Sequence, residues 1–289
     1  MSVEGVLNID KPEGITSHDL VKQIRRISSI RRVGHAGTLD PLATGVMLLC
    51  VGRATRLVEY LIGQNKSYAA TVRLGQTTDT FDADGALITE SSVRVTDTDI
   101  EQALTQFRGR IQQKAPSFSA IKRDGQPLYK LARQGIEVDP PVREVQIVDL
   151  QLLKWVNPFL QLELTCSSGT YVRSLAHDLG QVLGCGGHIT ALRRTAVDHF
   201  TLSQAVALDE LHMGDWADLL LPIDSAVQHL PPLELSAAEA ACIRVGQIFA
   251  RQDTLADAPL VRVYEPGGRF LAIVRSKDNY FQPHKVFLP

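Results

Sequence analysis

Apolar residues near the start of the chain recur at helical spacing and are followed by a continuous apolar run. Across TSHDLVKQIRRISSIRR, the apolar stripe of residues 20–27 leaves the basic side chains on the outer side of a helix. Thr16 and Asp19 have the spacing of a capping box, which predicts the first turn of this helix. The run VMLLCV at residues 46–51 is typical of a buried strand.

Two later segments alternate between apolar and polar positions, as strands with one buried face do. SYAATVRLG puts Tyr68 at the end of an inward row, and FLQLELTC has its inward row at residues 160–166. An SSGT turn then leads into a predicted helix with the apolar stripe Val172, Leu175, Leu179 and Val182. Arg173 falls in the first turn of that helix, where the helix dipole disfavours a cation unless an anion lies nearby.

Two segments between these elements differ sharply in charge. TTDTFDADG resembles part of a calcium loop, but Thr80 and Ser91 would occupy the first and last ligand positions, so a hairpin turn is the better interpretation. Residues 108–144 are basic, contain glycine turns and are interpreted as an insertion. It is expected to contain one short helix from Pro127 to Gly135.

The pattern changes again near Pro231 and Pro232, where QHLPPLELS is typical of a domain boundary. Beyond it, PLVRVYEPGGRFLAIVRS predicts two strands joined by a turn, and YFQPHKVF predicts another. We therefore expect two domains, residues 1–230 and a compact β-barrel of residues 231–289.

Composition places the 289-residue chain among ordinary globular proteins, with 44% apolar and 21% charged residues. The N-terminal sequence has no apolar core of signal-peptide length, and no uncharged stretch is long enough to span a membrane. Four widely spaced cysteines fit a reducing compartment, so we expect a cytoplasmic protein. CGGH at residues 185–188 resembles half a zinc site, but without a second pair a glycine turn is favoured and no metal is expected.

The formal net charge of −2 is unevenly distributed. Residues 1–75 carry ten basic and six acidic side chains and residues 108–144 carry eight and four, whereas residues 76–107 carry one and seven. The chain can thus present a local positive surface to a polyanion although it is nearly neutral as a whole. On charge alone, solvated faces without a function remain the simpler interpretation.

The segment GHAGTLDPLATG at residues 34–45 is the strongest candidate for chemistry. Motifs of P-loop, dinucleotide-binding, serine hydrolase and zincin proteins are absent from the sequence. Pro41 holds Asp40 in an extended conformation, and the glycines permit tight bends and close approach. An ionised Asp40, oriented by an arginine, is suited to act as a nucleophile. An Asx-type turn without catalytic function is the alternative.

Five sequence blocks occur in order across residues 4–200. They are GVLNIDKPEGITSHDLV, GHAGTLDPLATGVMLLCVG, KSYAATVRLGQTTDTFDADG, APSFSAIKRDGQPLYKLARQG, and CSSGTYVRSLAHDLG with LRRTAVDHF. In these blocks the chain resembles the TruB family, the bacterial tRNA pseudouridine-55 synthases. The resemblance implies an α+β pseudouridine-synthase fold, with a mixed, largely antiparallel sheet flanked by helices. The tail resembles, more loosely, the small PUA-type RNA-binding barrel of these enzymes.

The same resemblance implies roles for individual residues. Asp40 matches the catalytic nucleophile, Arg173 the arginine paired with it, and Tyr68 the tyrosine that stacks on the target uracil and takes part in removing the C5 proton. The remaining matches are with residues that bind the flipped uridine or support the catalytic loop: His35, Tyr171, Leu192 and Lys11.

The implied function is isomerisation of uridine to pseudouridine in the T-arm loop of tRNA, without a cofactor, by a monomer with no obligatory protein partner. Attack of Asp40 at C1′ and attack at C6 both remain open. Two other functions are kept as alternatives: a non-catalytic RNA-binding or RNA-folding protein, and an RNA-independent glycosyl-transfer enzyme. The basic helix and the insertion are candidates for phosphate contacts.

Overall fold

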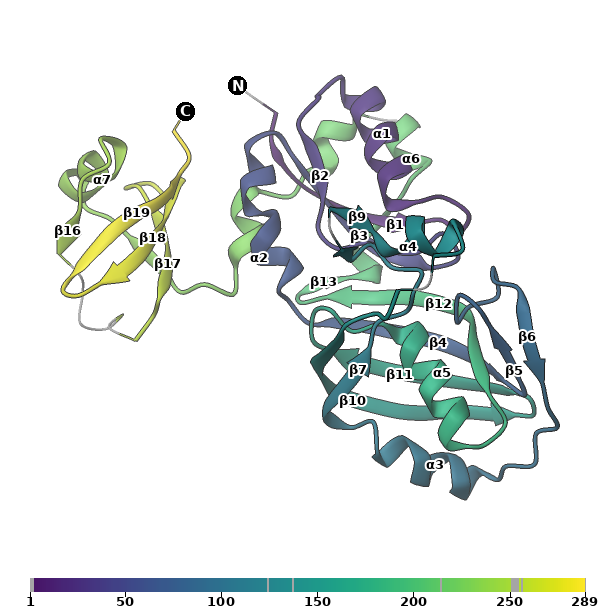
Figure 1. Cartoon of the computed structure of the whole chain (residues 1–289). Helices are drawn as coiled ribbons and strands as arrows, with labels where there is room; N and C mark the ends of the chain where they lie inside the picture. Colours follow the sequence, from purple (N-terminus) through teal and green to yellow (C-terminus); the bar gives the residue numbers. More distant parts are fainter. Residues whose placement is uncertain are drawn as a thin grey trace.

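The computed structural model describes residues 3–123, 125–136, 138–213, 215–250, 255 and 257–288. Figure 1 shows a large part built on a sheet and a small strand-rich part, formed by the end of the chain and joined to the first by an extended segment. Across the described ranges, no helix has both the length and the apolar character needed to cross a membrane.

A ten-stranded sheet organises the large part. Its strands are β1 (Gly5–Lys11), β2 (Val33–His35), β3 (Thr44–Val51), β4 (Lys66–Leu74), β7 (Gly109–Lys114), β10 (Val142–Val156), β11 (Phe159–Cys166), β12 (Gly187–Val197), β13 (Phe200–Thr201) and β14 (Val206–Ala207). Along the sheet the order is β14-β1-β3-β12-β4-β11-β10-β7, with β2 beside β3 and β13 beside β12. Most pairs are antiparallel, but β12 runs parallel to β3 and β14 runs parallel to β1. The sheet is therefore mixed and largely antiparallel, as predicted, and the three predicted strands are β3, β4 and β11.

Helices α1 (Ser17–Ser28), α3 (Asp97–Thr105) and α5 (Val172–Val182) share one apolar core with one face of this sheet, and Leu211 of a further short helix joins it. The predicted capping box of α1 is confirmed, because the Thr16 hydroxyl accepts a bond from the Asp19 amide and the Asp19 carboxylate accepts one from the Thr16 amide. The predicted stripe of α5 is wrong at its end, where Val182 is 46% exposed. The chain turns at Gly184, and Cys185 occupies the core in its place.

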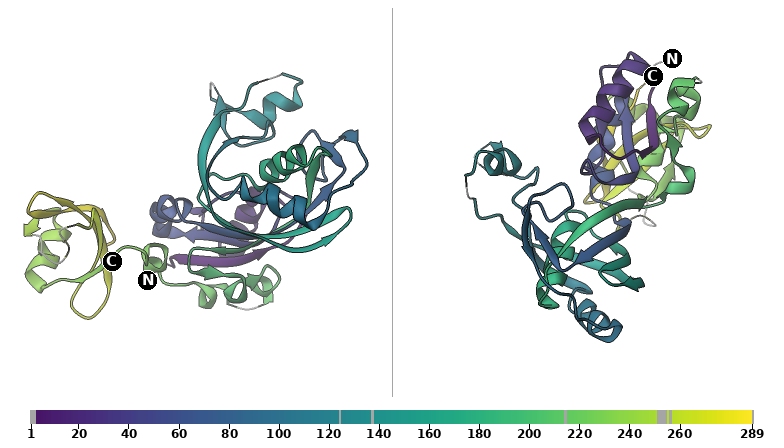
Figure 2. Two further views of the ribbon diagram at one scale, coloured as in Figure 1. Left: turned by 90° about the horizontal axis from the view of Figure 1, so that it is seen from below. Right: turned by 90° about the vertical axis from the view of Figure 1, so that its right-hand side faces the viewer.

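The acidic segment forms the predicted hairpin, with β5 (Gln76–Thr78) antiparallel to β6 (Leu87–Glu90). The basic segment is only partly an insertion, because β7 and the start of β10 belong to the main sheet. Residues 115–141 leave the sheet and contain β8 (Lys122–Arg123), β9 (Gln126–Pro127) and the predicted helix, α4 (Leu128–Arg133). In the left view of Figure 2 this inserted segment stands above the sheet, on the side that carries α5.

The end of the chain forms a curled five-stranded sheet with its own core, the predicted small PUA-like barrel. Its elements are β15 (Pro232–Glu234), α7 (Ala237–Arg244), β16 (Phe249–Ala250), β17 (Leu260–Tyr264), β18 (Phe270–Lys277) and β19 (Tyr280–Val286). The predicted turn joins β17 and β18, and the last predicted strand is β19.

A second apolar cluster joins the barrel to the opposite face of the large sheet. Phe270 and Phe287 of the barrel pack there with Leu57 and with Leu61 of the short helix α2 (Val58–Ile62). Arg56 donates a hydrogen bond to the Val286 carbonyl at 2.6 Å, and its guanidinium lies 4.8 Å from the Phe287 ring centroid. The remaining helix, α6 (Glu210–Met213), lies close to β14.

Candidate active site

Asp40 lies in the loop between β2 and β3, which is fastened at both of its sides. The Ser17 hydroxyl accepts a bond from the Leu39 amide at 2.9 Å and lies 3.0 Å from the Leu39 carbonyl. The Asp40 carbonyl accepts from the Ala43 amide at 3.1 Å, and the Pro41 carbonyl accepts from the Gly14 amide at 2.9 Å. The start of α1 and a tight turn therefore set the direction of the Asp40 side chain.

Two glycines give this loop its path. Gly37 and Gly45 have φ of +97° and +100°, a region that other residues rarely adopt. A Cβ atom at Gly45 would lie 2.2 Å from the Arg194 carbonyl oxygen, so β3 and β12 approach closely only because this residue is glycine. The predicted role of the glycines holds for these two positions, whereas Gly34 lies in β2 without a positive φ.

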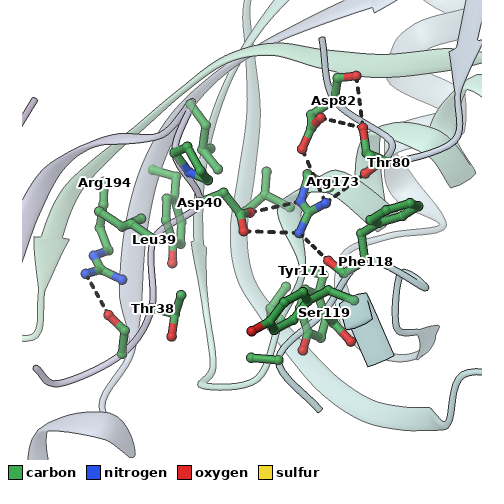
Figure 3. A pocket seen from close by; sticks show the side chains of 18 of the residues that line it. Thr38, Leu39, Asp40, Thr80, Asp82, Phe118, Ser119, Tyr171, Arg173 and Arg194 are labelled. Carbon is green, nitrogen blue, oxygen red and sulfur yellow. Dashed lines mark hydrogen bonds and ion pairs between the residues drawn. The ribbon is translucent and has the colours of Figure 1, made fainter. Parts of the chain in front are cut away.

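Arg173 lies in the first turn of α5, and the anion expected near it is the Asp40 carboxylate. Its side chain is only 7% exposed, its Nε lies 2.9 Å from Asp40 Oδ2, and its Nη2 donates to Asp40 Oδ1 at 3.2 Å. It also donates to the carbonyls of Thr80 at 2.8 Å and Phe118 at 3.0 Å. Figure 3 shows this guanidinium between the Asp40 carboxylate on one side and Thr80 and Phe118 on the other.

Asp82 is a second acidic partner of Arg173 that the sequence interpretation missed. Its Oδ2 lies 3.2 Å from Arg173 Nη1, and both side chains are 7% exposed. Thr80 donates to Asp82 Oδ1 at 2.5 Å, and the Asp84 amide donates to the same oxygen at 3.2 Å. The acidic hairpin segment contained the clue, because an arginine buried at a helix start is better balanced when carboxylates flank it on two sides.

The pKa of Asp40 depends on its burial and on two charged neighbours, Arg173 and Asp82. Burial raises the pKa of the Asp40 carboxyl above its ordinary value, the Arg173 guanidinium lowers it, and Asp82 raises it again. The side chain is 36% exposed and faces the adjoining cavity, whereas Arg173 is almost fully covered. The carboxylate is thus oriented from behind and open in front, which suits attack on a bound molecule.

The cavity in front of Asp40 has a volume of about 640 Å³. Tyr68 from β4, Leu192 from β12 and Tyr171 from the start of α5 line it together with Asp40 and Arg173. Tyr68 and Leu192 are each 8% exposed, and burial raises the pKa of Tyr68 and that of Tyr171. Five of the seven predicted site residues therefore meet in one cavity.

The other two predicted site residues do not line the cavity. Lys11 is fully buried and donates from Nζ to the carbonyls of Pro12, Ile15 and Pro41 at 2.8, 2.8 and 3.4 Å, so it braces the loop from behind. Burial lowers its pKa to about 8. His35 lies in β2 with a buried Nδ1 for which the described residues provide no hydrogen-bond partner, and burial lowers its pKa.

Gln113 of β7 is a further residue that the sequence interpretation missed. It is 2% exposed, accepts from the Tyr171 amide at 2.8 Å and donates to the Tyr171 carbonyl at 3.0 Å. This paired contact fixes the backbone just before Arg173. Nothing local in GRIQQK distinguishes this glutamine from its neighbour, because the contact depends on strand pairing.

The CGGH segment at residues 185–188 forms the turn between α5 and β12 and the start of β12. Cys185 is buried at the turn after α5, where Gly186 has a positive φ. In the part of the chain that the structure describes, no group of three or more His, Cys, Asp or Glu residues is arranged to hold a metal ion.

Comparison with known proteins agrees with the fold. A solved structure of a Cbf5-Nop10-Gar1 complex aligns with a TM-score of 0.75 at 25% identity, covering 99% of this chain and 85% of that one. An H/ACA RNP bound to a substrate RNA containing 2′-deoxyuridine aligns with a TM-score of 0.74 at 24% identity and, at that identity, supports the fold alone.

Sequence comparison gives the family. Residues 25–172 match the model of the TruB family pseudouridylate synthase N-terminal domain, and residues 173–228 match that of the tRNA pseudouridylate synthase B C-terminal domain. Proteins named tRNA pseudouridine synthase B are 47% identical in Aromatoleum aromaticum and 44% in Pseudomonas aeruginosa, covering 96% of this chain in both cases and 90% and 93% of the relatives. The chain belongs to the TruB family.

Proposed function

We propose that this protein converts uridine 55 in the T-arm loop of tRNA to pseudouridine, with Asp40 as the nucleophile and the target base flipped into the cavity. Family membership supports pseudouridine formation in tRNA, because the relatives carry that activity in their names. The position in the tRNA, the nucleophile and the flipped base are the finer parts of the proposal.

The observation that carries the proposal is the placement of the Asp40 carboxylate. It is held by two contacts to Arg173 and opens onto a cavity whose walls include Tyr68 and Leu192. A binding module would use the positive surfaces but would have no use for a carboxylate aligned in this way. This argues against the alternative of a non-catalytic RNA-binding protein, although an enzyme that opens the tRNA also remodels it.

The chemistry matches these groups. The N1–C1′ bond of uridine breaks and a C5–C1′ bond forms, so no atoms are added and no electrons are exchanged with a cofactor. The carboxylate attacks at C1′ or at C6, and its orientation by Arg173 is needed for either path. Apolar wall residues such as Leu192 exclude water while the detached base turns.

RNA recognition is assigned to two regions. The inserted segment carries Lys122, Arg123, Lys130 and Arg133, of which Arg133 lines the cavity, and it supplies charge for phosphate contacts. We also propose that residues 231–289 are a separate RNA-binding domain, attached to a catalytic domain of residues 1–230. A single-stranded loop exposes bases and 2′-hydroxyls, which suits a T-arm loop as the target.

Replacing Asp40 by asparagine tests the nucleophile. Asp40→Asn keeps the shape of the side chain but removes the attacking charge, so turnover is expected to fall by about 10⁴-fold or more while RNA affinity changes little. Turnover is measured as tritium release from a T-arm stem-loop labelled at uridine C5, and affinity by filter binding.

The matched control is Asp149→Asn, which removes an exposed carboxylate of β10 far from the cavity and should leave both quantities unchanged. A parallel loss of affinity and turnover in Asp40→Asn would contradict the nucleophile assignment. A tRNA transcript with cytidine in place of uridine 55 should yield no pseudouridine, and modification of another uridine would contradict the position.

A further inference from the structure

Arg194 is a buried cation on the cavity wall whose contacts are all neutral. It lies in β12, is 1% exposed, and donates from Nε to the Val46 carbonyl at 2.7 Å and from Nη2 to the Gly37 carbonyl at 3.4 Å. Its Nη2 also lies 3.7 Å from Met47 Sδ. Among the described residues no carboxylate forms an ion pair with it, and Figure 3 shows it on the far side of Asp40 from Arg173.

An uncompensated buried charge costs several kcal/mol, so this arrangement calls for an explanation. The neighbouring Arg193 shows the ordinary solution, since its side chain is 40% exposed and its Nη2 lies 2.6 Å from Asp10 Oδ2. The two arginines follow one another on β12 but point to opposite faces of the sheet. Only Arg194 lines the cavity.

Tyr68 is the partner that the strand register gives to Arg194. The two residues lie directly opposite each other in the antiparallel pair of β4 and β12, so their side chains share one face. Both line the cavity in front of Asp40. The guanidinium charge is thus placed beside the phenol to which the family resemblance assigns removal of the C5 proton.

Other titratable groups around Tyr68 do not replace this charge. Lys66, on the same face of β4, keeps most of its charge at neutral pH although burial lowers its pKa to about 8. Its Nζ, however, donates to the carbonyls of Ile62 and Gln64, which precede β4. On β11, burial raises the pKa of the Cys166 thiol to about 11, so this group is neutral.

The two remaining charged neighbours balance each other. Asp40 faces Tyr68 from the catalytic loop, and the guanidinium of Arg173 on α5 is already paired with Asp40 and Asp82. Arg194 is therefore the cation available to a negative charge on Tyr68.

We propose that Arg194 is a positioning residue for catalysis, a buried counter-charge that stabilises the phenolate form of Tyr68. The inference rests on the proposed function and adds a residue to it. After the C5–C1′ bond has formed, C5 still carries a hydrogen. The C5–H bond then breaks, its electrons form the C5–C6 double bond, and the proton passes to the phenolate oxygen, which becomes a phenol. The pair displaced from C6 moves from the N1–C6 double bond to N1, which takes up a proton, if Asp40 attacked C1′. If Asp40 attacked C6, the displaced pair returns to the carboxylate as the C6–O bond breaks.

The sign of the effect follows from the two influences on Tyr68. Burial raises the pKa of Tyr68, and the charge of Arg194 opposes that rise. At neutral pH a minor fraction of the protein holds the phenolate, and Arg194 sets the size of this fraction. Without the guanidinium the pKa of Tyr68 rises further, so the increase of the rate with pH shifts to higher pH.

Arg194→Gln in the full chain is the direct experiment, with single-turnover tritium release measured across pH. The rate at neutral pH is expected to fall about 10- to 1,000-fold and to recover as pH rises. The reason is that removal of a neighbouring opposite charge changes the pKa of a group such as the Tyr68 phenol by about one to three. Arg193→Gln is the matched control, and its pH profile should equal that of the unmodified protein. If the rate of Arg194→Gln were reduced by the same factor at every pH, the inference would be overturned.

A second pair of variants addresses folding, since Arg194→Gln leaves the Val46 carbonyl without its donor. Arg194→Lys keeps the charge and should retain the pH profile of the unmodified protein, whereas a profile displaced as far as that of Arg194→Gln would overturn the inference. Replacing Tyr68 by a fluorotyrosine, which ionises more readily, should restore most of the rate lost in Arg194→Gln. Absence of rescue in a variant that binds RNA normally would also overturn it.

Tyr68→Phe separates this inference from the function on which it rests. Full turnover in Tyr68→Phe would show that Tyr68 does not accept the C5 proton. An inactive Tyr68→Phe together with an unaltered profile in Arg194→Gln would leave the assignment of Tyr68 intact and remove only the role of Arg194.

Discussion

The Arg173 side chain joins three separate parts of the chain at the candidate site. It contacts Asp40 in one loop, Asp82 and Thr80 in the acidic hairpin, and Phe118 at the start of the inserted segment. Nε and Nη2 contact Asp40, Nη1 contacts Asp82 and Thr80, and Nη2 also contacts Phe118, a planar set of donors that lysine has no means of reproducing. The direction of the Asp40 carboxylate therefore depends on groups that do not touch it.

Removing the second carboxylate should expose this dependence. In Asp82→Asn, Arg173 loses one of its two charge partners and turns toward Asp40, so kcat is expected to fall about 10²-fold with little change in KM. Steady-state tritium release over a range of RNA concentrations measures both constants.

Asp79→Asn is the control, because Asp79 is exposed in the same hairpin and an asparagine still accepts the bond from the Ala86 amide. A rise in KM with unchanged kcat in Asp82→Asn would assign Asp82 to RNA binding rather than to orientation of Arg173.

At the scale of elements, short sequence patterns predicted the helix starts and strands that depend only on neighbouring residues. The capping box at Thr16 predicted the start of α1, and strict alternation predicted β4 and β11. Two other capping boxes, at Thr96 and Ser236, begin α3 and α7, and the sequence interpretation overlooked both although the same rule applies.

Pairing between distant strands accounts for the parts that were not predicted. The position of β12 between β3 and β4 places Arg194 opposite Tyr68, and the pairing of β7 with β10 brings Gln113 to the start of α5. No short window of sequence encodes such neighbours. Five of the seven predicted site residues meet in one cavity, but they came from the family resemblance and not from periodicity.

The contact between β3 and β12 makes a sharp prediction for Gly45. In Gly45→Ala the new Cβ would meet the Arg194 carbonyl at 2.2 Å in a backbone conformation that already disfavours alanine, so stability should fall by about 3 kcal/mol or more. Urea unfolding followed by circular dichroism measures this loss.

Gly14→Ala separates steric overlap from backbone strain, because Gly14 has a similar φ of +85° but no atom within 4 Å of an added Cβ. Its expected loss is about 1 kcal/mol. Equal losses in the two variants would contradict the close approach of the strands.

At the scale of the whole molecule, the barrel is packed against the large sheet through a shared apolar cluster and is not merely tethered to it. Figure 1 shows the extended segment that links the two parts, while Phe270, Ile273 and Phe287 supply the packing. The RNA-binding surface proposed for residues 231–289 would thereby be held at a set position relative to the cavity.

Phe287→Ala tests this packing. Phe287 is 2% exposed, so truncation should cost about 3 to 5 kcal/mol of stability and should also weaken RNA binding. Thermal unfolding and filter binding are the measurements, and Leu288→Ala, at a residue that is 41% exposed, is the control. An unchanged unfolding temperature in Phe287→Ala would contradict a fixed barrel.

The strand order has a consequence for synthesis on the ribosome. Residues 187–197 fill the middle of the sheet, yet they are made after every other strand of the path except β14. Until they emerge, the nascent chain carries two half-sheets with unpaired inner edges, which are prone to associate with other chains. The carboxylate at residue 40 and the phenol at residue 68 are brought together only when that late strand closes the gap, so a chain interrupted before it has neither a continuous sheet nor the cavity in front of residue 40.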